Sequence, residues 1–394
     1  KKEEIPIPEL GVILKNIPFL SQSELIFPRD SQYYAPQLCG SKLNLNHILF
    51  EGAMERIIKM SDQEIKENNG FNYLMMYPDH QEKAPGVILL LHGMNERDWY
   101  KYLPWGQKLV EATSKAVIFF PLAFHVNRAL PDWHDRRLMQ EVNQKRQELF
   151  THMADSSFSN AAMSTRLHFA PARFFLSGLE TYQDIIQWVM QLRQGGIPQI
   201  DKDARLDFFG YSAGAFLAQI LMMANRDQLF EDSRAIFFCG GCLLNRMYLQ
   251  SKYIMDSEAY RAILNYYVED FDRNLQDDAN LRALFDSTQT GGIYFRSLLS
   301  EGHSQANQIR KKRLEELKNQ LFALSLANDD IMPSAEIQAS LIGLRGNSVV
   351  PVEVMDFPYK YSHMNPFPNT TRSEEAIDQG FEDTFKLFSD FLNG

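Results

Sequence analysis

The chain has 394 residues, of which 45% are hydrophobic and 12% aromatic, and its formal net charge is -10 at pH 7. This composition suits a large buried core and excludes an intrinsically disordered protein. Binding to nucleic acid or to an anionic membrane surface needs a cationic surface, so the acidic balance argues against both as main partners. The one dense basic run, residues 310–313, lies in a helical pattern with acidic neighbours, which favours a solvated helix face.

No apolar stretch is long enough to cross a bilayer, and the first ten residues have no hydrophobic signal core. We therefore expect a cytoplasmic protein, and an exported form stays open because the chain begins with Lys1 rather than Met. Cys239 and Cys242 have a spacing that suits redox or zinc chemistry, but no second Cys or His pair follows them, which favours structural thiols. We expect no metal and no organic cofactor.

Residues 1–70 are rich in proline and predict an N-terminal arm. From Phe71 onward, continuous apolar runs alternate with helical patterns, and this alternation predicts parallel βαβ units in an α/β sheet. The expected strands are 71–77, 86–91, 116–123, 206–209, 235–238, 321–326 and 349–357, and the expected helices are 102–113, 180–194 and 215–225. The stretch 124–177 is long and polar, and the pattern does not assign helices or strands within it.

Residues 245–318 are too many for a simple crossover between two strands, so we expect a helical insertion there. Its aromatic side chains favour a cap or lid over a pocket, and a peripheral or dimerising module is the alternative. The core then comprises residues 71–244 and 319–394. A capping box formed by Thr371 and Glu374 predicts a closing helix that packs on the sheet.

The pentapeptide Gly210-Tyr211-Ser212-Ala213-Gly214 lies between an expected strand and an expected helix. In such a turn the serine adopts a strained backbone that exposes its hydroxyl, and glycines two residues away prevent collisions of Cβ atoms. The motif therefore predicts that Ser212 is a nucleophile. Since the pattern is short enough to arise by chance, the interpretation depends on the rest of the chain.

A serine hydroxyl needs a base to take its proton and a carboxylate to orient that base. Asp329 and Asp330 follow one expected strand, and His363 follows the last one. The carboxyl ends of parallel strands meet at one edge of a sheet, which is also the edge where Ser212 is expected. His363 is the only histidine after the two aspartates, so the order Ser, Asp, His leaves one choice for the base.

In these features the chain resembles the α/β-hydrolase family over residues 71–394 without the insertion. The resemblance implies the α/β-hydrolase fold, in which a mostly parallel central sheet is flanked by helices, here with a helical cap insertion. In this family the acid often opens an Asp-x-x-x-Pro turn, and Pro333 then favours Asp329 over Asp330. Residues 99–133 also resemble a group of uncharacterised bacterial α/β-hydrolases, which implies no substrate.

Acyl transfer through a tetrahedral intermediate needs two backbone N–H donors for the developing oxyanion. Ala213, the residue after the proposed nucleophile, is expected to supply one. The resemblance implies that Met94 supplies the second, because His92 and Gly93 precede it directly after an apolar strand.

The candidate substrate-binding residues are Tyr211 in the elbow and His125, Asn127 and Arg128, which follow the expected strand 116–123 at the same edge. Arg128 is suited to hold an anionic group, and a structural salt bridge is the alternative. Trp133 and His134 are expected near the same entrance. The predictions that Tyr211, His125, Asn127 and Arg128 bind substrate rest on their position along the chain alone.

The expected function is that of a serine hydrolase, which cleaves a carboxylic ester through an acyl-enzyme; a thioester or an amide is less favoured. An acyltransferase would use the same groups, and the sequence does not separate the two. A noncatalytic binding protein that keeps the fold as a scaffold is the alternative from another class. The expected partner is a small-molecule acyl substrate, and the oligomeric state stays open.

Overall fold

The computed structural model describes residues 4–7, 12–21 and 52–394. Part of the proposed N-terminal arm, including the proline-rich segment 22–51, lies outside these residues. Within the described part of the chain, no helix combines the length and the hydropathy that crossing a membrane requires.

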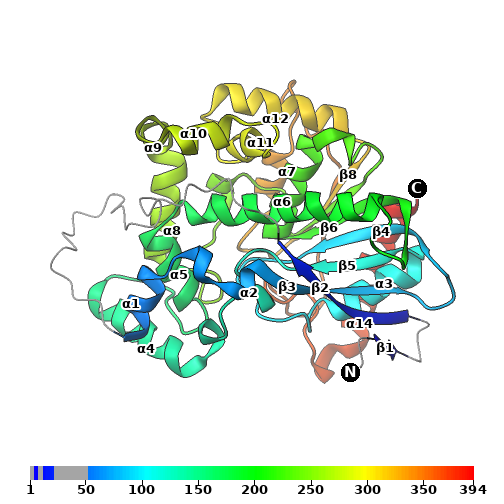
Figure 1. Cartoon of the computed structure of the whole chain (residues 1–394), viewed down its shortest axis with the longest axis horizontal. Coiled ribbons are helices and arrows are strands. Elements are labelled where there is room, and N and C mark those ends of the chain that lie inside the picture. Colours follow the sequence, from blue (N-terminus) through cyan, green and yellow to red (C-terminus); the bar gives the residue numbers. More distant parts are fainter. Residues whose placement is uncertain (1–3, 8–11, 22–51) are drawn as a thin grey trace.

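A single twisted sheet forms the centre of the molecule (Figure 1). Its strands, in spatial order, are β1 (Glu4–Ile7), β2 (Val12–Leu20), β3 (Gly70–Pro78), β5 (Ala116–Phe120), β4 (Ala84–Leu91), β6 (Ile200–Tyr211), β7 (Ala235–Phe238), β8 (Leu321–Leu326) and β9 (Val352–Met355). The strands from β5 to β9 run parallel, and β1, β2 and β3 are antiparallel to their neighbours. From β2 onward this is the strand order of the α/β-hydrolase fold, so the fold expected from the sequence is confirmed.

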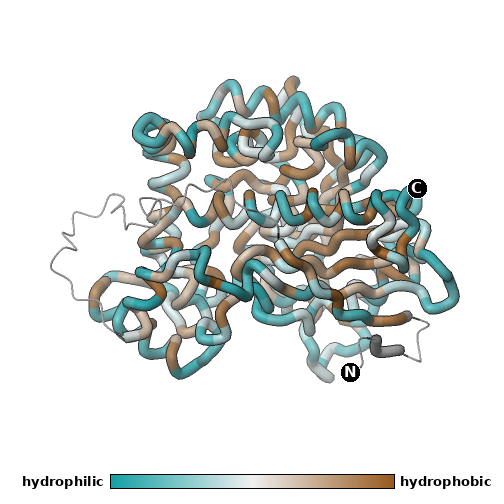
Figure 2. The backbone as a smooth tube through the Cα atoms, in the orientation of Figure 1, coloured by the Kyte–Doolittle hydropathy of each residue, from teal (hydrophilic) through white to brown (hydrophobic). Residues whose placement is uncertain are grey.

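The central strands are buried on both faces, which explains their continuous apolar sequences. Every residue from Val87 to Leu91 in β4 has no solvent exposure, and the same holds for Ala116 to Phe120 in β5. Parallel strands have continuous apolar sequences because helices cover both faces of the sheet. Figure 2 shows the hydrophobic residues gathered along these strands.

Helices cover both faces of the sheet. On one face α6 (Arg173–Arg193) and α7 (Ala213–Ala224) contribute to the larger hydrophobic cluster. On the other face α3 (Leu103–Thr113) and α14 (Glu374–Asn393) pack together in the second cluster. The closing helix is therefore confirmed. The capping box is wrong, because residues 371–373 form a short 3₁₀ turn that the hydroxyl of Thr370 caps.

A group of helices at the lower left of Figure 1 forms a third hydrophobic cluster. It contains α1 (Gly52–Lys59), α4 (Arg136–Leu149) and α5 (Ala161–Phe169). Two of these helices, α4 and α5, lie in the polar stretch 124–177, which the sequence pattern left unassigned. Their polar appearance has a physical reason: Arg146 of α4 is buried and pairs with buried Asp256 at 2.7 Å.

Residues 245–318 are mainly helical and pack beside α7 and α5. They form α8 (Ser257–Leu264), the π-helix η8 (Asn265–Glu269), α9 (Phe271–Asp277), α10 (Ala279–Asp286), α11 (Gly292–Ser297) and α12 (Ser304–Leu317). The remaining helices are short: α2 (Lys66–Asn69), α13 (Ser334–Ser340), and the 3₁₀ turns at 62–64, 126–128, 131–134, 226–228 and 244–246. In Figure 1, α9 to α12 lie above α6 and α7, on the side away from α4.

Candidate active site

Ser212 lies in the sharp turn between β6 and α7, with φ of 55° and ψ of -116°. Non-glycine residues seldom adopt this conformation, and it persists only where the surroundings enforce it. A Cβ atom on Gly210 would lie 2.6 Å from the backbone nitrogen of Ala215, and one on Gly214 would lie 2.0 Å from the carbonyl oxygen of Leu91. Both glycines are therefore needed for the turn, as their spacing predicts.

A chain of hydrogen bonds joins Ser212, His363 and Asp329. His363 Nε2 is 2.9 Å from Ser212 Oγ, and His363 Nδ1 is 2.8 Å from Asp329 Oδ2. Because a carboxylate only accepts, Nδ1 carries the proton and Nε2 is left to accept from the serine hydroxyl. All three side chains are buried.

The second oxygen of Asp329 is held by the backbone. Its Oδ1 accepts from the N–H groups of Ile331 at 2.9 Å and Met332 at 2.8 Å. These bonds fix the carboxylate plane that His363 meets. Asp330, the alternative acid in the sequence, is exposed to solvent, so Asp329 is the aspartate that contacts the imidazole.

Tyr211 supports His363 rather than lining the pocket. Its ring stacks on the imidazole of His363 with centroids 5.5 Å apart, and its hydroxyl donates to the His363 carbonyl oxygen. Burial raises the pKa of Tyr211 well above its usual value, so the phenol stays a neutral donor. The sequence prediction that Tyr211 binds substrate is therefore wrong: the residue is 1% exposed and does not line the pocket.

The loop after β4 reaches Ser212 through Gly93 and Met94. Gly93 packs against Tyr211, where an added Cβ would lie 3.2 Å from the ring, and its N–H donates to the Tyr102 hydroxyl at 3.0 Å. Met94 and Ala213 both line the pocket that contains Ser212. Neither of their backbone N–H groups donates to another described residue.

His92 holds this loop in place through two hydrogen bonds. Its Nε2 accepts from the N–H of Leu122 at 3.0 Å, so its Nδ1 carries the proton and donates to the carbonyl oxygen of Gly93 at 2.7 Å. Burial lowers the pKa of His92 well below its usual value, so the ring is neutral at physiological pH.

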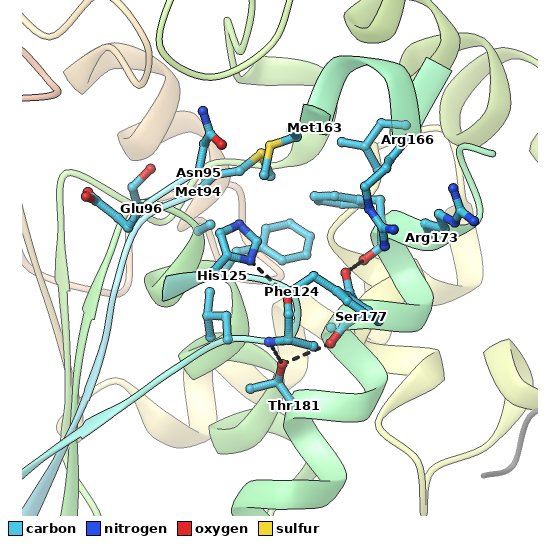
Figure 3. Close-up of a pocket in the computed structure, with 18 of the residues that line it drawn as sticks. Met94, Asn95, Glu96, Phe124, His125, Met163, Arg166, Arg173, Ser177 and Thr181 are labelled. Carbon is cyan, nitrogen blue, oxygen red and sulfur yellow. Dashed lines mark hydrogen bonds between the residues drawn. The ribbon is translucent and has the colours of Figure 1, made fainter. Parts of the chain in front are cut away.

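The pocket above Ser212 is lined mainly by apolar side chains, and Figure 3 shows part of its wall. Its apolar lining includes Leu122, Phe124, Ala129, Trp133, Ala162, Met163, Leu167, Phe174, Phe216, Leu217, Ile220, Met247, Leu249, Phe295 and Met332. Trp133 and His134 line it as expected. Residues 245–318 supply only Met247, Leu249 and Phe295, whereas α5 and α6 supply most of the wall opposite α7.

Only one of the three candidates after β5 lines the pocket. His125 does, with its Nδ1 bonded to the carbonyl oxygen of Ala123 at 2.8 Å, and burial lowers its pKa to about 4, so the ring is neutral. Asn127 is exposed and donates to the carbonyl oxygen of Asn72 at 2.8 Å, away from the pocket. The substrate-binding prediction for Asn127 is therefore wrong.

Arg128 is completely buried in an ion cluster. It pairs with Asp184 at 2.8 Å and with Glu180 at 3.4 Å, and its guanidinium lies 4.0 Å from the centroid of the Phe71 ring. Since Arg128 does not line the pocket, its predicted role in binding an anion is wrong, and the structural salt bridge is the correct alternative.

Sequence reasoning missed the wall that α5 and α6 contribute. On α6, Phe174, Ser177, Gly178 and Thr181 line the pocket at the spacing of one helix face. The only signal in the sequence is the group of small residues Ser177, Gly178 and Thr181 on one face of a helix whose other residues are mostly larger. The helix pattern found at 180–194 begins too late to include Phe174, Ser177 and Gly178.

Cys239 lies beside this site, and its sulfur, a carboxylate oxygen of Asp329 and a ring nitrogen of His363 lie within 4.8 Å of one another. Burial and the Asp329 carboxylate raise the pKa of the Cys239 thiol well above its usual value, which disfavours the thiolate that binds metals. Cys242 is buried as well, and burial raises its thiol pKa. Both observations favour structural thiols.

Comparison with protein families gives one match that spans the chain. The model described as "Family of unknown function (DUF6051)" matches residues 1–393. The chain belongs to this family. A comparison with curated proteins gives no match.

Several solved structures are similar to this member of the family. The esterase Est22 in complex with p-nitrophenol is 13% identical, with a TM-score of 0.46 over 98% of this chain and 82% of that one. Carboxyl esterase 2 from the fungus Tuber melanosporum is 11% identical, with a TM-score of 0.44 over 82% and 81%. The acylaminoacyl peptidase of Pyrococcus horikoshii is 14% identical, with a TM-score of 0.42 over 82% of this chain and 39% of that one.

Proposed function

We propose that this protein is a serine hydrolase that cleaves a carboxylic ester through an acyl-enzyme. The observation that carries the proposal is the continuous hydrogen-bond chain from Ser212 through His363 to Asp329. The strained backbone of Ser212 supports it, because such strain is retained where it serves the chemistry.

In the first half of the reaction, Ser212 Oγ attacks the ester carbonyl carbon and His363 Nε2 takes the hydroxyl proton. The carbonyl oxygen becomes an oxyanion, which the backbone N–H groups of Met94 and Ala213 stabilise. Collapse of the intermediate breaks the bond to the alcohol, and His363 returns the proton to the departing oxygen. Asp329 orients the imidazole and stabilises its positive charge throughout.

In the second half, His363 takes a proton from water as the water oxygen attacks the acyl-enzyme carbonyl. The second tetrahedral intermediate releases the carboxylic acid, and the proton returns to Ser212 Oγ. An alcohol in place of water would give a new ester, which is how an acyltransferase would use the same groups.

The test is steady-state hydrolysis of p-nitrophenyl butyrate by the wild type, Ser212→Ala and His363→Gln, with Ser373→Ala as a matched control away from the pocket. We expect release of p-nitrophenol by the wild type and the control, and a loss of about 10³-fold or more in kcat for both site variants. A wild type without turnover, or a Ser212→Ala variant as active as the wild type, would refute the proposal. Product analysis with added alcohol distinguishes hydrolysis from acyl transfer.

A further inference from the structure

We propose that the pocket accepts an unbranched apolar acyl chain of medium length lying along α7, and that Gly178 sets the length it admits. This inference rests on the proposed function, since it describes the acyl group that Ser212 would receive.

One side of the pocket follows α7 away from the serine. Ala213, Phe216, Leu217 and Ile220 all line it, and they occupy one face of the helix. Ile220 lies eight residues after Ser212, which corresponds to about 12 Å along the helix axis. The pocket therefore extends far enough from the nucleophile for a chain of at least about eight carbons, since an extended chain advances about 1.2 Å for each bond.

The facing wall is the row of lining residues on α6. Thr181 lies beside the loop after β5, because its hydroxyl accepts from the N–H of Ala123 at 2.9 Å. Phe174, two turns earlier, contacts the aromatic side chains on the other walls: its ring centroid lies 6.2 Å from that of Phe216 and 5.8 Å from that of Phe295. Gly178 lies between these two levels of the helix.

Gly178 leaves a space that another residue would fill. A Cβ atom built on it has no heavy atom within 4 Å. Its φ lies outside the left-handed region, so a larger residue fits the backbone without strain. Glycine in a helix interior lowers the stability of the helix relative to alanine. At this position, the lack of a side chain widens the pocket.

Charged groups line one side of the pocket. Arg166 and Arg173 pair with Asp62 at 3.0 and 3.2 Å, and Figure 3 shows both arginines on the opposite side of the pocket from Met94. An apolar chain directed toward them would cover charged groups without bonding to them, which is unfavourable, so we expect the chain to run along α7 toward Ile220 instead. Ile220 is the last residue of α7 that lines the pocket, so a palmitoyl chain would exceed this length and an acetyl group would leave most of it unfilled.

The experiment measures kcat/KM for p-nitrophenyl esters from acetate to palmitate with the wild type, Gly178→Ala and Gly178→Leu. The wild type should prefer octanoate to acetate and palmitate by about tenfold or more, because each added methylene buried in the pocket favours binding. Gly178→Leu should lower kcat/KM for octanoate by about tenfold and leave acetate within about twofold, since the leucine fills the space beyond the first carbons. Gly178→Ala, which adds one methyl group, should lie between them, and thermal melting should show that all three fold.

A wild type that prefers acetate, or a Gly178→Leu variant that loses acetate and octanoate equally, would overturn the inference. To separate this result from a failure of the proposed chemistry, Ser212→Ala is titrated with octanoate and with acetate as ligands. If Ser212→Ala binds octanoate more tightly than acetate, and adding Gly178→Leu to this variant weakens octanoate binding, the chain pocket is supported even without turnover. Equal binding of octanoate by Ser212→Ala with and without Gly178→Leu contradicts it.

Discussion

His92 Nδ1 donates its hydrogen to the carbonyl oxygen of Gly93 at 2.7 Å, while its Nε2 accepts from the N–H of Leu122 at 3.0 Å. The C=O of Gly93 and the N–H of Met94 belong to one planar trans peptide and point in opposite directions. By holding the carbonyl, His92 therefore also sets the direction of the Met94 N–H, which is the proposed oxyanion donor.

Replacing His92 by alanine should lower kcat for ester hydrolysis by about 10- to 100-fold. Removing an oxyanion donor costs about 10²- to 10³-fold, and here the Met94 N–H is less well oriented rather than removed. KM should change little, since the ground-state carbonyl needs the donor less than the oxyanion does. His80→Ala is the control, because His80 is exposed and interacts with its chain neighbours Asp79 and Gln81, away from the site. Equal kcat for His92→Ala and the wild type would show that Met94 does not depend on the imidazole.

Asp329→Asn should lower kcat by about 10³- to 10⁴-fold, because an amide leaves His363 in the wrong tautomer to accept the serine proton. Asp330→Asn is a matched control, since the neighbouring carboxylate is exposed. Its kcat should stay within about twofold of the wild type. If instead Asp330→Asn were the impaired variant, the orientation of His363 by Asp329 would be refuted.

Gly214→Ala should destabilise the fold by about 3 kcal/mol or more, because the added Cβ would lie 2.0 Å from the Leu91 carbonyl oxygen in β4. Gly178→Ala makes the same substitution where no atom lies within 4 Å, and it should stabilise α6 by up to about 1 kcal/mol. Urea unfolding followed by circular dichroism measures both. A Gly214→Ala variant as stable as Gly178→Ala would contradict the packing of the elbow.

Glu180→Gln tests the buried cluster around Arg128. Burial raises the pKa of Glu180 to about 7, although Arg128 opposes the shift. The folded state then binds a proton more readily than the unfolded one, so wild-type stability falls as pH rises from about 4.5 to 7. Gln, which is neutral throughout, should be more stable than the wild type at pH 8 by on the order of 1–3 kcal/mol, and equally stable at pH 4. The free energy of unfolding at both pH values measures this, and a less stable variant at pH 8 would contradict it.

The sheet could be predicted because its central strands are buried on both faces, which leaves unbroken apolar runs such as 86–91. The helices α4 and α5 could not, because their interior depends on charged residues paired across long sequence separations. Arg146 and Asp256 are 110 residues apart, and neither side chain looks like a core residue until the other is placed against it.

The hydrogen-bonded groups at Ser212 were predictable because each follows a strand, so local patterns along the chain bring them to one edge. The pocket was not, because its walls depend on which helix faces meet. Arg128 has the charge expected of a substrate-binding residue but is buried in an ion pair with Asp184. Gly178, which has no functional group to mark it in the sequence, lines the pocket.

The central claim is that Ser212 is an activated nucleophile, and the most direct measurement is covalent labelling by a fluorophosphonate, followed by intact mass and peptide mapping. The account predicts one adduct per chain on Ser212, strongly slowed in His363→Gln and absent in Ser212→Ala. No adduct on the wild type, or an adduct that persists in Ser212→Ala, would contradict it.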